Sequence, residues 1–324
     1  MFDVLTIGDA VEDIFIRPQQ GISFRELKNE VLTLRQGSKI EIKEALVDVG
    51  GCAANVAVGL SRLEIKSAVL APLGEDEAAK RILKKFQDES ISKKYLKQSS
   101  KYKSSFSVII LVDEERTIFT YHGLDDYSVL KLPQRKLANW YYLAALGEGW
   151  EKVLKNVVEH TAKYSINLAF NPGMLQLEAG VMKLSPLLRV TKILFVNELE
   201  ARELTRGKKY EIKEMLTDIR RLGPEIVVIT EGKKGANLYD GKKFYHIEVY
   251  PAQEVEVTGA GDAFATGFLT AKINGEDNLA ALKWAVIEAA LCTEAIGAQT
   301  NLPTLKQMQK ELKNKAMLHV RPIE

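Results

Sequence analysis

The chain has 324 residues, of which 46% are hydrophobic and 27% are charged, and its formal net charge is +2. This composition predicts a folded chain with a sizeable core, and the balanced charge argues against a dedicated nucleic-acid-binding protein. Cys52 and Cys292 lie far apart, and the four histidines show no zinc-site spacing. There is no signal-peptide pattern and no run near the roughly 20 apolar residues of a membrane span, so we expect a cytoplasmic protein with no membrane partner.

Short apolar runs that end in turn residues alternate with helix-period segments along most of the chain. The expected strands are Asp3–Gly8, Ser67–Leu73, Trp140–Ala145, Ile166–Phe170, Lys192–Val196 and Glu225–Ile229. The expected helices are Ala53–Leu63, Asp76–Glu89, Trp150–Tyr164, Glu178–Leu188, Glu198–Thr205, Glu211–Leu222, Ala263–Ile273, Leu279–Ile296 and Thr304–Lys315. This alternation predicts a mostly parallel sheet with helices on both faces.

Two stretches, about 14–49 and 103–122, break this rhythm with alternating strand-like segments. Within the second, Val108–Val112 and Thr117–Tyr121 are expected to pair as an antiparallel hairpin through residues 113–116. No helical segment is available to cover these strands. We therefore expect one domain spanning 1–324 that includes a small separate antiparallel sheet. This sheet could be a flap over a site, a decorative edge or a dimer surface, and a flap could also be one of the latter two.

Polar residues follow several of the expected parallel strands. Gly8-Asp9, Asn197-Glu198 and Thr230-Glu231-Gly232 each stand where a strand ends. Each alone is more often a turn or a helix cap. Because ligands collect beyond the carboxyl ends of parallel strands, these three together with the turn at 258–262 predict a shared pocket.

The run Gly259-Ala260-Gly261-Asp262 places small residues and one carboxylate at the start of a helix. Unpaired amides at a helix start attract anions, and an adjacent aspartate can accept a proton. An anion site beside a base is what phosphoryl transfer to an alcohol requires. The alternative is a glycine-rich turn with a capping acid.

Asn197 and Glu200 are three residues apart and share a face of the first helical turn. The pair could hold a hydrated Mg²⁺, which prefers few protein oxygens and several waters. A capping box explains the same spacing, and from the residues alone it comes first.

Other candidates lie nearer the two ends of the chain. Gly50 and Gly51 allow close approach of the backbone, and Asn55 offers a donor and an acceptor, although a tight strand-to-helix turn explains them equally. Asp13 could accept hydrogen bonds from hydroxyl groups or be an ordinary loop acid. The run from Thr230 through Gly232 to Gly235 offers a hydroxyl and bare amides to phosphates, or is a turn.

The chain lacks the P-loop pattern, the G-x-G-x-x-G fingerprint after its first strand, and the G-x-S-x-G elbow. Taken in their order along the chain, the motifs that it does have resemble those of the PfkB/ribokinase family of small-molecule kinases. The resemblance covers nearly the whole length of the chain. The marks are Gly50-Gly51 with Asn55, Asn197-Glu198-Leu199-Glu200, Thr230-Glu231-Gly232, Thr258-Gly259-Ala260-Gly261-Asp262 and Gly297-Ala298-Gln299.

The resemblance implies a ribokinase-like fold that uses ATP and Mg²⁺. Asp262 would be the general base, and the amides of Gly259, Ala260 and Gly261 would form the anion hole. The other implied roles are metal positioning through water (Asn197, Glu200), ATP binding (Asn197, Thr230, Gly232, Gly235, Thr258) and acceptor binding (Asp13, Gly50, Gly51, Asn55). The antiparallel strands would be the lid, which often mediates dimers.

The sequence departs from the family pattern at two places. Glu256-Val257-Thr258 stands where Asp-Thr-Thr is frequent, and that aspartate helps to hold a monovalent cation in some members, so K⁺ dependence is left open. Ala79 replaces the second glycine of a Gly-x-Asp-x-x-Gly motif, and we expect only a structural effect.

The expected activity is transfer of the γ-phosphoryl group of ATP to a hydroxymethyl group of a small sugar. The alternative acceptor is a nucleoside, whose base would need a stacking surface. Phe106, Phe119 or Tyr121 could supply that surface or could form the core of the lid. A catalytically silent ligand-binding protein of the same fold is a different class, which the intact Asp262 and its glycines argue against.

Overall fold

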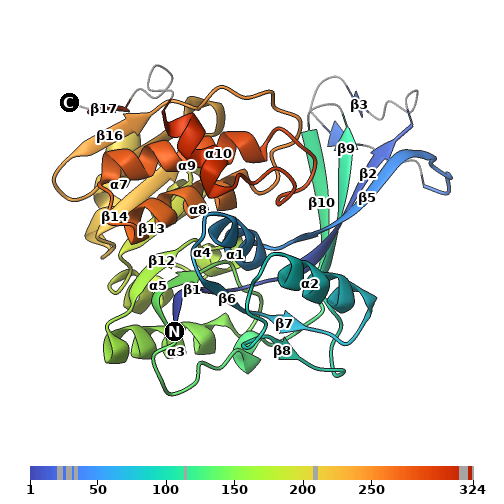
Figure 1. The fold of residues 1–324 in the computed structure, drawn as a ribbon, viewed down its shortest axis with the longest axis horizontal. Helices are drawn as coiled ribbons and strands as arrows, with labels where there is room; N and C mark the ends of the chain where they lie inside the picture. Colours follow the sequence, from blue (N-terminus) through green and yellow to red (C-terminus); the bar gives the residue numbers. More distant parts are fainter. Residues whose placement is uncertain are drawn as a thin grey trace.

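The computed structural model describes residues 1–19, 25–26, 31–32, 36–112, 115–206, 211–313 and 320–322. Within these residues the chain forms a large α/β body, and a smaller sheet projects from one side of it (Figure 1).

The body is built on a central sheet of nine described strands in the order β17-β16-β15-β14-β13-β12-β11-β1-β6. Its parallel part consists of β1 (Phe2–Ile7), β6 (Ser67–Leu70), β11 (Ala138–Leu143), β12 (Asn167–Phe170), β13 (Ile193–Asn197) and β14 (Ile226–Thr230). All six predicted strands are present and parallel. The segment predicted as Ser67–Leu73 is divided, because β7 (Pro72–Leu73) pairs separately with β8 (Lys97–Gln98).

Three strands of the body were not predicted. β15 (Ala236–Tyr239), β16 (Phe244–Ile247) and β17 (Val320–Pro322) extend the sheet in antiparallel order beyond β14. They have three or four residues each, which is too short for a clear alternating pattern.

Helices cover both faces of the central sheet, as predicted. One face carries α1 (Cys52–Arg62), α2 (Glu77–Asp88), α8 (Ala260–Ile273), α9 (Asn278–Cys292) and α10 (Leu305–Leu312). The other carries α3 (Trp150–Tyr164), α4 (Met174–Glu178), α5 (Val181–Leu188), α6 (Glu198–Leu204) and α7 (Ile212–Arg221). Neighbouring strand residues alternate between two apolar clusters: Val4 packs with the first set of helices and Leu5 with the second.

Four of the predicted helices differ from their predicted limits by more than one residue. The segment predicted as Glu178–Leu188 is broken at Gly180, whose positive φ of 88° ends α4 before α5 begins. Helix α8 starts at Ala260 rather than Ala263, so Asp262 is its third residue. Helix α9 ends at Cys292 rather than Ile296, and residues 314–315 of the last predicted helix lie outside the described residues. None of the described helices is long and apolar enough to cross a membrane.

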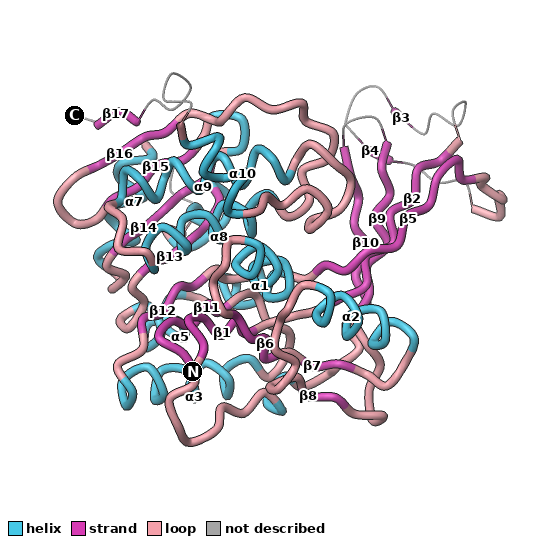
Figure 2. The backbone as a smooth tube through the Cα atoms, in the orientation of Figure 1, coloured by secondary structure: helices cyan, strands magenta, loops and turns pink. Residues whose placement is uncertain are grey.

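The smaller sheet has the strand order β10-β9-β2-β5 (Figure 2). Its strands are β2 (Val11–Pro18), β5 (Ile42–Gly50), β9 (Phe106–Val112) and β10 (Glu115–Tyr121), and a separate two-stranded ladder joins β3 (Arg25–Glu26) to β4 (Val31–Leu32). The predicted hairpin is confirmed by the antiparallel β9–β10 pair, although residues 113–114 of its turn lie outside the described residues. The sheet is not wholly antiparallel, because β2 and β9 run parallel.

The strand register divides the side chains of the smaller sheet between two faces. Asp13 lies opposite Ser107 and Phe15 opposite Ile109, so these residues share one face. We call it the inner face, because Phe15, Ile109 and Leu111 on it are buried together with Ile296 of the body.

The opposite, outer face carries Phe106, Phe119 and Tyr121, which are 37%, 54% and 45% exposed. Register places these aromatic rings on the face away from Asp13, so they do not share a face with that candidate acceptor residue, and their stacking on a nucleoside base remains a prediction. They do not form the core of the lid either: among the described residues that core is on the inner face.

Candidate active site

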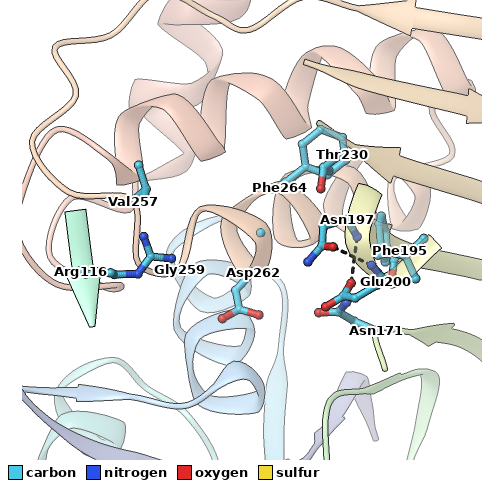
Figure 3. Close-up of a pocket in the computed structure, with 12 residues that line it drawn as sticks. Arg116, Asn171, Phe195, Asn197, Glu200, Thr230, Val257, Gly259, Asp262 and Phe264 are labelled. Atoms are coloured by element: carbon cyan, nitrogen blue, oxygen red, sulfur yellow. Dashed lines mark hydrogen bonds between the residues drawn. The ribbon is translucent and has the colours of Figure 1, made fainter. Parts of the chain in front are cut away.

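A cavity of about 180 Å³ opens at the carboxyl ends of β13 and β14, beside the start of α8 (Figure 3). Its lining includes Asn197, Glu200, Thr230, Gly259, Gly261 and Asp262. The polar ends of two parallel strands and the glycine turn therefore meet in one cavity, as the sequence predicts. Gly8-Asp9, the third predicted strand end, is not part of this lining; the Asp9 carboxylate accepts a hydrogen bond from the Tyr127 hydroxyl at 2.5 Å.

The turn before α8 can exist only because residue 259 is glycine. Gly259 caps the helix with φ at 81°, and a Cβ atom there would lie 2.5 Å from the Cβ of Ala298 and 2.8 Å from its Cα. The amide of Ala260 donates to the carbonyl of Val257 at 3.2 Å. It therefore has a partner within the turn in this structure, and its role in binding an anion remains a prediction.

The other amides of this turn are available. Those of Gly259, Gly261 and Asp262 have no hydrogen-bond partner within the described residues. They stand at the positive end of the dipole of a 14-residue helix. An anion bound in the cavity would be stabilised by these amides.

The Asp262 carboxylate is buried in this cavity, with 7% of the residue exposed. Burial raises its pKa to about 7; hydrogen bonds from Asn55 and Cys52 oppose the shift and the charge of Glu200 adds to it. A carboxylate with a near-neutral pKa is a suitable general base for an alcohol at physiological pH. As a helix N3 residue it also occupies a position where acids are stabilised, although no backbone amide of the described residues donates to it, and its role as the general base remains a prediction.

A chain of amides orients Asp262. The Asn55 side-chain nitrogen donates to Asp262 Oδ2 at 2.8 Å, and the Gln299 side-chain nitrogen donates to Asn55 Oδ1 at 2.9 Å. Arg62 in turn holds the backbone carbonyls of Gln299 and Leu302 at 2.8 and 2.9 Å. Asn55 thus contacts the candidate base rather than lining the cavity, and its binding of an acceptor remains a prediction.

Asn197 and Glu200 form the capping box that the sequence favours. Asn197 Oδ1 accepts from the Glu200 amide at 2.9 Å, and Glu200 Oε2 accepts from the Asn197 amide at 2.8 Å. One Glu200 oxygen is left for the cavity, and burial raises the pKa of this carboxyl. A single carboxylate oxygen suits a magnesium ion that keeps most of its waters, and the described residues contain no cluster of three or more metal-ligating side chains.

Asp13 lies on strand β2, not in a loop as predicted. It is 5% exposed, and a Cβ on Gly50 would overlap its carboxylate. Burial raises the pKa of Asp13 to about 7; a hydrogen bond with Ser107 opposes the shift, and the charges of Asp48, Glu256 and Asp262 add to it. Asp13 is thus electrostatically coupled to the candidate base, although it is not part of the lining of the cavity.

The remaining predicted residues have structural partners here. Thr258 donates to Glu256 Oε1 through its amide, at 2.7 Å, and through its hydroxyl. Gly51 caps α1, and Gly232 and Gly235 shape the turn between β14 and β15. None of these four lines the cavity, so their ligand-binding roles remain predictions.

Two polar residues that line the cavity were missed from the sequence. Arg116 of β10 lines the cavity, although its segment reads as the charged turn of a hairpin. Asn171, at the end of β12, also lines it and donates to the Phe195 carbonyl at 3.0 Å. The signal for Asn171 was available, because it is another polar residue directly after a predicted parallel strand.

Comparisons with known proteins agree with this geometry. A family model described as pfkB family carbohydrate kinase matches residues 7–305. A nucleoside kinase of Methanocaldococcus jannaschii is 28% identical over 280 residues, which cover 85% of this chain and 89% of that protein. A ribokinase of Bacillus subtilis is 28% identical over 268 residues, covering 81% and 87%.

Solved structures show the same fold. The crystal structure of the M. jannaschii nucleoside kinase superimposes with a TM-score of 0.81 at 23% identity, covering 97% of this chain and 99% of that one. An Arabidopsis thaliana ribokinase complexed with ribose and ATP gives a TM-score of 0.80 at 23% identity, with 96% and 99% covered.

The chain belongs to the pfkB family of carbohydrate kinases, and its fold is ribokinase-like. It is therefore a phosphotransferase that acts on hydroxyl groups, an ATP-dependent sugar or nucleoside kinase.

Proposed function

We propose that the chain transfers the γ-phosphoryl group of ATP to a hydroxymethyl group of a small sugar. One observation carries this proposal: the buried Asp262, with a pKa of about 7, shares a cavity with the unpartnered amides at the start of α8. A base and an anion site are thereby brought within reach of one reacting group.

In the proposed reaction, the acceptor hydroxyl oxygen attacks the γ-phosphorus in line. The bond from that phosphorus to the β–γ bridging oxygen breaks, and ADP leaves with the bridging oxygen. Asp262 takes the hydroxyl proton, and the amides of Gly259 and Gly261 hold the charged phosphoryl oxygens.

Glu200, oriented by its capping box with Asn197, would position Mg²⁺ through water, and the ion would neutralise phosphate charge. Thr230 lines the same cavity and would face the ATP phosphates, followed by Gly232 and Gly235. For the acceptor, we assign its hydroxyl groups to Asp13 and Asn55, next to Gly50 and Gly51.

A sugar is supported over a nucleoside by the faces of the smaller sheet. The exposed aromatic residues are on its outer face, whereas Phe15, the one aromatic residue on the inner face of the described strands, is buried with Ile109 and Leu111 and leaves no exposed ring beside Asp13. A nucleoside remains the second candidate, since relatives of both kinds are 28% identical to this chain.

We further propose that residues 1–324 work as one kinase domain in which the smaller sheet is the lid. The lid would close over the acceptor so that water does not consume ATP.

The outer face of the smaller sheet would bind a second copy of the chain. Val47, Ile14, Val108 and Phe119 form an apolar row across all four strands, and such rows favour burial. Sedimentation should show a dimer at micromolar concentration that Phe119→Lys dissociates; a wild-type monomer would overturn this part.

The activity is tested by ATP consumption with a panel of pentoses, hexoses and nucleosides, each with Asp262→Asn beside the wild type. We expect a small sugar to give the highest kcat/KM and the variant to lose that turnover. A preference for a nucleoside would show that the acceptor is a nucleoside rather than a sugar. No Asp262-dependent turnover with any compound, from protein that binds ATP, would favour a silent ligand-binding protein instead.

A further inference from the structure

Glu288 of α9 is an acid in the interior of the body that has no hydrogen-bond partner among the described residues. It is 0% exposed, and both of its side-chain oxygens are buried and unpartnered. The neighbouring cation, Arg62, is used elsewhere: it donates to Glu89 at 3.1 and 2.6 Å and to the carbonyls of Gln299 and Leu302. Because an unpaired charge is very unfavourable in such a place, the carboxyl group keeps its proton.

The Gln299 side chain has the opposite need. It is also 0% exposed, and its Nε2 donates to Asn55 Oδ1 at 2.9 Å. Its Oε1 is buried and receives no hydrogen bond from the described residues. A protonated carboxyl group has one O–H to donate, and an amide oxygen accepts such a bond. Glu288 is therefore a buried donor without an acceptor, and Gln299 presents a buried acceptor without a donor.

Both residues lie against the same stretch of α1. A Cβ on Gly59 would come within 3.3 Å of Glu288 Oε1. Gly59 is four residues after Asn55, which binds the Gln299 side chain, and three residues before Arg62, which binds the Gln299 carbonyl at 2.8 Å. The helical spacing thus places Glu288 between the two contacts that hold Gln299.

Helix α9 also brings the two residues together. Cys292, four residues after Glu288, donates its thiol to the carbonyl of Ala298 at 3.5 Å, directly before Gln299. The thiol is neutral, because burial raises the pKa of Cys292 to about 12.

The titratable groups around this interior are Arg62 on α1, Asp262 on α8, Cys292 on α9 and Glu256 in the segment before α8. Burial raises the pKa of Glu288 well above its usual value, and the positive charge of Arg62 opposes the shift. A proton on Glu288 is thus consistent with its surroundings on every side.

The amide chain from Gln299 to Asp262 has two possible directions, because half a turn of an amide group exchanges its oxygen and its nitrogen. In the direction described above, Asn55 donates to Asp262 at 2.8 Å, which favours the ionised carboxylate. In the reverse direction, Asn55 would present its oxygen to Asp262, and Gln299 would donate to Glu288. That direction favours a protonated Asp262 and an ionised Glu288.

We propose that Glu288 is a positioning residue, whose protonated carboxyl group donates to Gln299 Oε1 and keeps the amide chain directed towards Asp262. The proton stays on Glu288 throughout the cycle, and no covalent bond forms or breaks there. Glu288 does not line the cavity, so it acts on the reaction only through the ionisation of Asp262. The proposal rests on the proposed function, in which Asp262 is the base.

The pH dependence of turnover tests this role. Glu288→Met removes the donor with little change in size, so Asp262 should lose its proton only at higher pH. The midpoint of the acidic limb of kcat/KM should rise by roughly one pH unit, with an unchanged plateau above it. Glu288→Gln offers an N–H in the same place and should keep the wild-type midpoint. A merely structural role would lower turnover by the same factor at every pH.

Two further variants control this result. Thr270 of α8 is also 0% exposed with an unpartnered side-chain oxygen, but it is not part of the amide chain, so Thr270→Val should keep the wild-type midpoint. Gln299→Met should raise the midpoint as Glu288→Met does. Combining the two should give no further shift, because Glu288 acts through Gln299.

Infrared spectroscopy of the protein without substrates measures the proton directly. At about pH 9, Asp13 and Asp262 are ionised, since their pKa values are about 7. The wild type should still show the band of a protonated carboxyl group, and Glu288→Gln should lose it.

The proposal is overturned if Glu288→Met keeps the wild-type midpoint, if Thr270→Val shifts it equally, if the double variant shifts it further, or if Glu288→Gln loses no protonated-carboxyl band. Each kinetic result requires a wild type whose turnover depends on Asp262, and leaves the kinase assignment intact. A wild type without such turnover would instead contradict the proposed function.

Discussion

The body and the smaller sheet contribute to the site in different ways. The body supplies groups from element ends: Asn197 and Thr230 close parallel strands, and Gly259 to Asp262 open a helix. The smaller sheet supplies Asp13 and Arg116 from strand interiors, where the register alone decides which face a side chain takes. We infer that Asp262 of the body acts in the phosphate chemistry and that Asp13 of the sheet acts in acceptor binding, so changes at these two residues should affect different kinetic constants.

The largest effect is expected at Asp262. Asp262→Asn keeps the size of the side chain but removes the base, so kcat should fall by roughly 10²–10⁴-fold. The matched control is Asp277→Asn at the N-cap of α9, where the aspartate accepts from the Ala280 amide at 2.8 Å and asparagine caps equally well. Steady-state kinetics on the best acceptor provide the measurement, and full turnover by Asp262→Asn would contradict the role of the base.

Substitutions at Gly259 and Gly261 test two different requirements of the site. Gly259 determines the backbone conformation of the turn, and Gly261 leaves space inside the cavity. Gly259→Ala combines an unfavourable φ with a clash against Ala298, so it should lower both Tm and kcat. A Cβ on Gly261 meets no atom within 4 Å, so Gly261→Ala should keep the wild-type Tm and weaken ATP binding only. Thermal melts and nucleotide titrations distinguish the two variants. An equal loss of Tm in both would contradict the different roles given to Gly259 and Gly261.

Asp13 tests the smaller sheet directly. If it binds acceptor hydroxyls, Asp13→Asn should raise the acceptor KM roughly 10–100-fold, the equivalent of one hydrogen bond to a charged group, and change kcat far less. A suitable control is Glu12→Gln, the neighbouring residue on the opposite face of β2, whose partner is Arg81. A fall in kcat with an unchanged KM would place Asp13 with the phosphate chemistry instead.

The smallest effect concerns pH and stability. The folded-state pKa of Asp262, about 7, lies above its usual value of 3.8, so between these values the folded state holds a proton that the unfolded state releases. Binding of this proton stabilises the folded state relative to the unfolded state, and this stabilisation is lost as the pH rises towards 7. The Tm of Asp262→Asn minus that of the wild type should therefore increase from pH 5 to pH 8; a constant difference would contradict a raised pKa.

The sequence predicted the site most accurately where a functional residue lies at the end of a strand or at the start of a helix. Asn197 and Thr230 come after apolar runs that can only be buried strands, so their shared cavity was predictable. Asp13 was assigned to a loop; in the structure Val11, Glu12 and Asp13 are all buried, so this part of β2 lacks the apolar–polar alternation by which a strand is recognised.

Two contacts could not be predicted at all. Arg116 enters the cavity through tertiary placement of a hairpin, and its local sequence has the charges typical of a turn. Gln299 was recognised only as part of a closing motif. Its contact with Asn55 joins residues 244 positions apart, which no local pattern encodes.

The amide chain behind Asp262 also determines where its proton can go. Gln299 donates to Asn55, and Asn55 and the Cys52 thiol donate to Asp262, so each of these contacts points towards the carboxylate. Among the described contacts, none of these partners can accept a proton from Asp262. A proton taken from an alcohol therefore has a single exit, back through the mouth of the cavity. If Asp262 is the base and the smaller sheet closes over the cavity as proposed, the sheet would have to open before the base is regenerated, which would couple product departure to the next cycle.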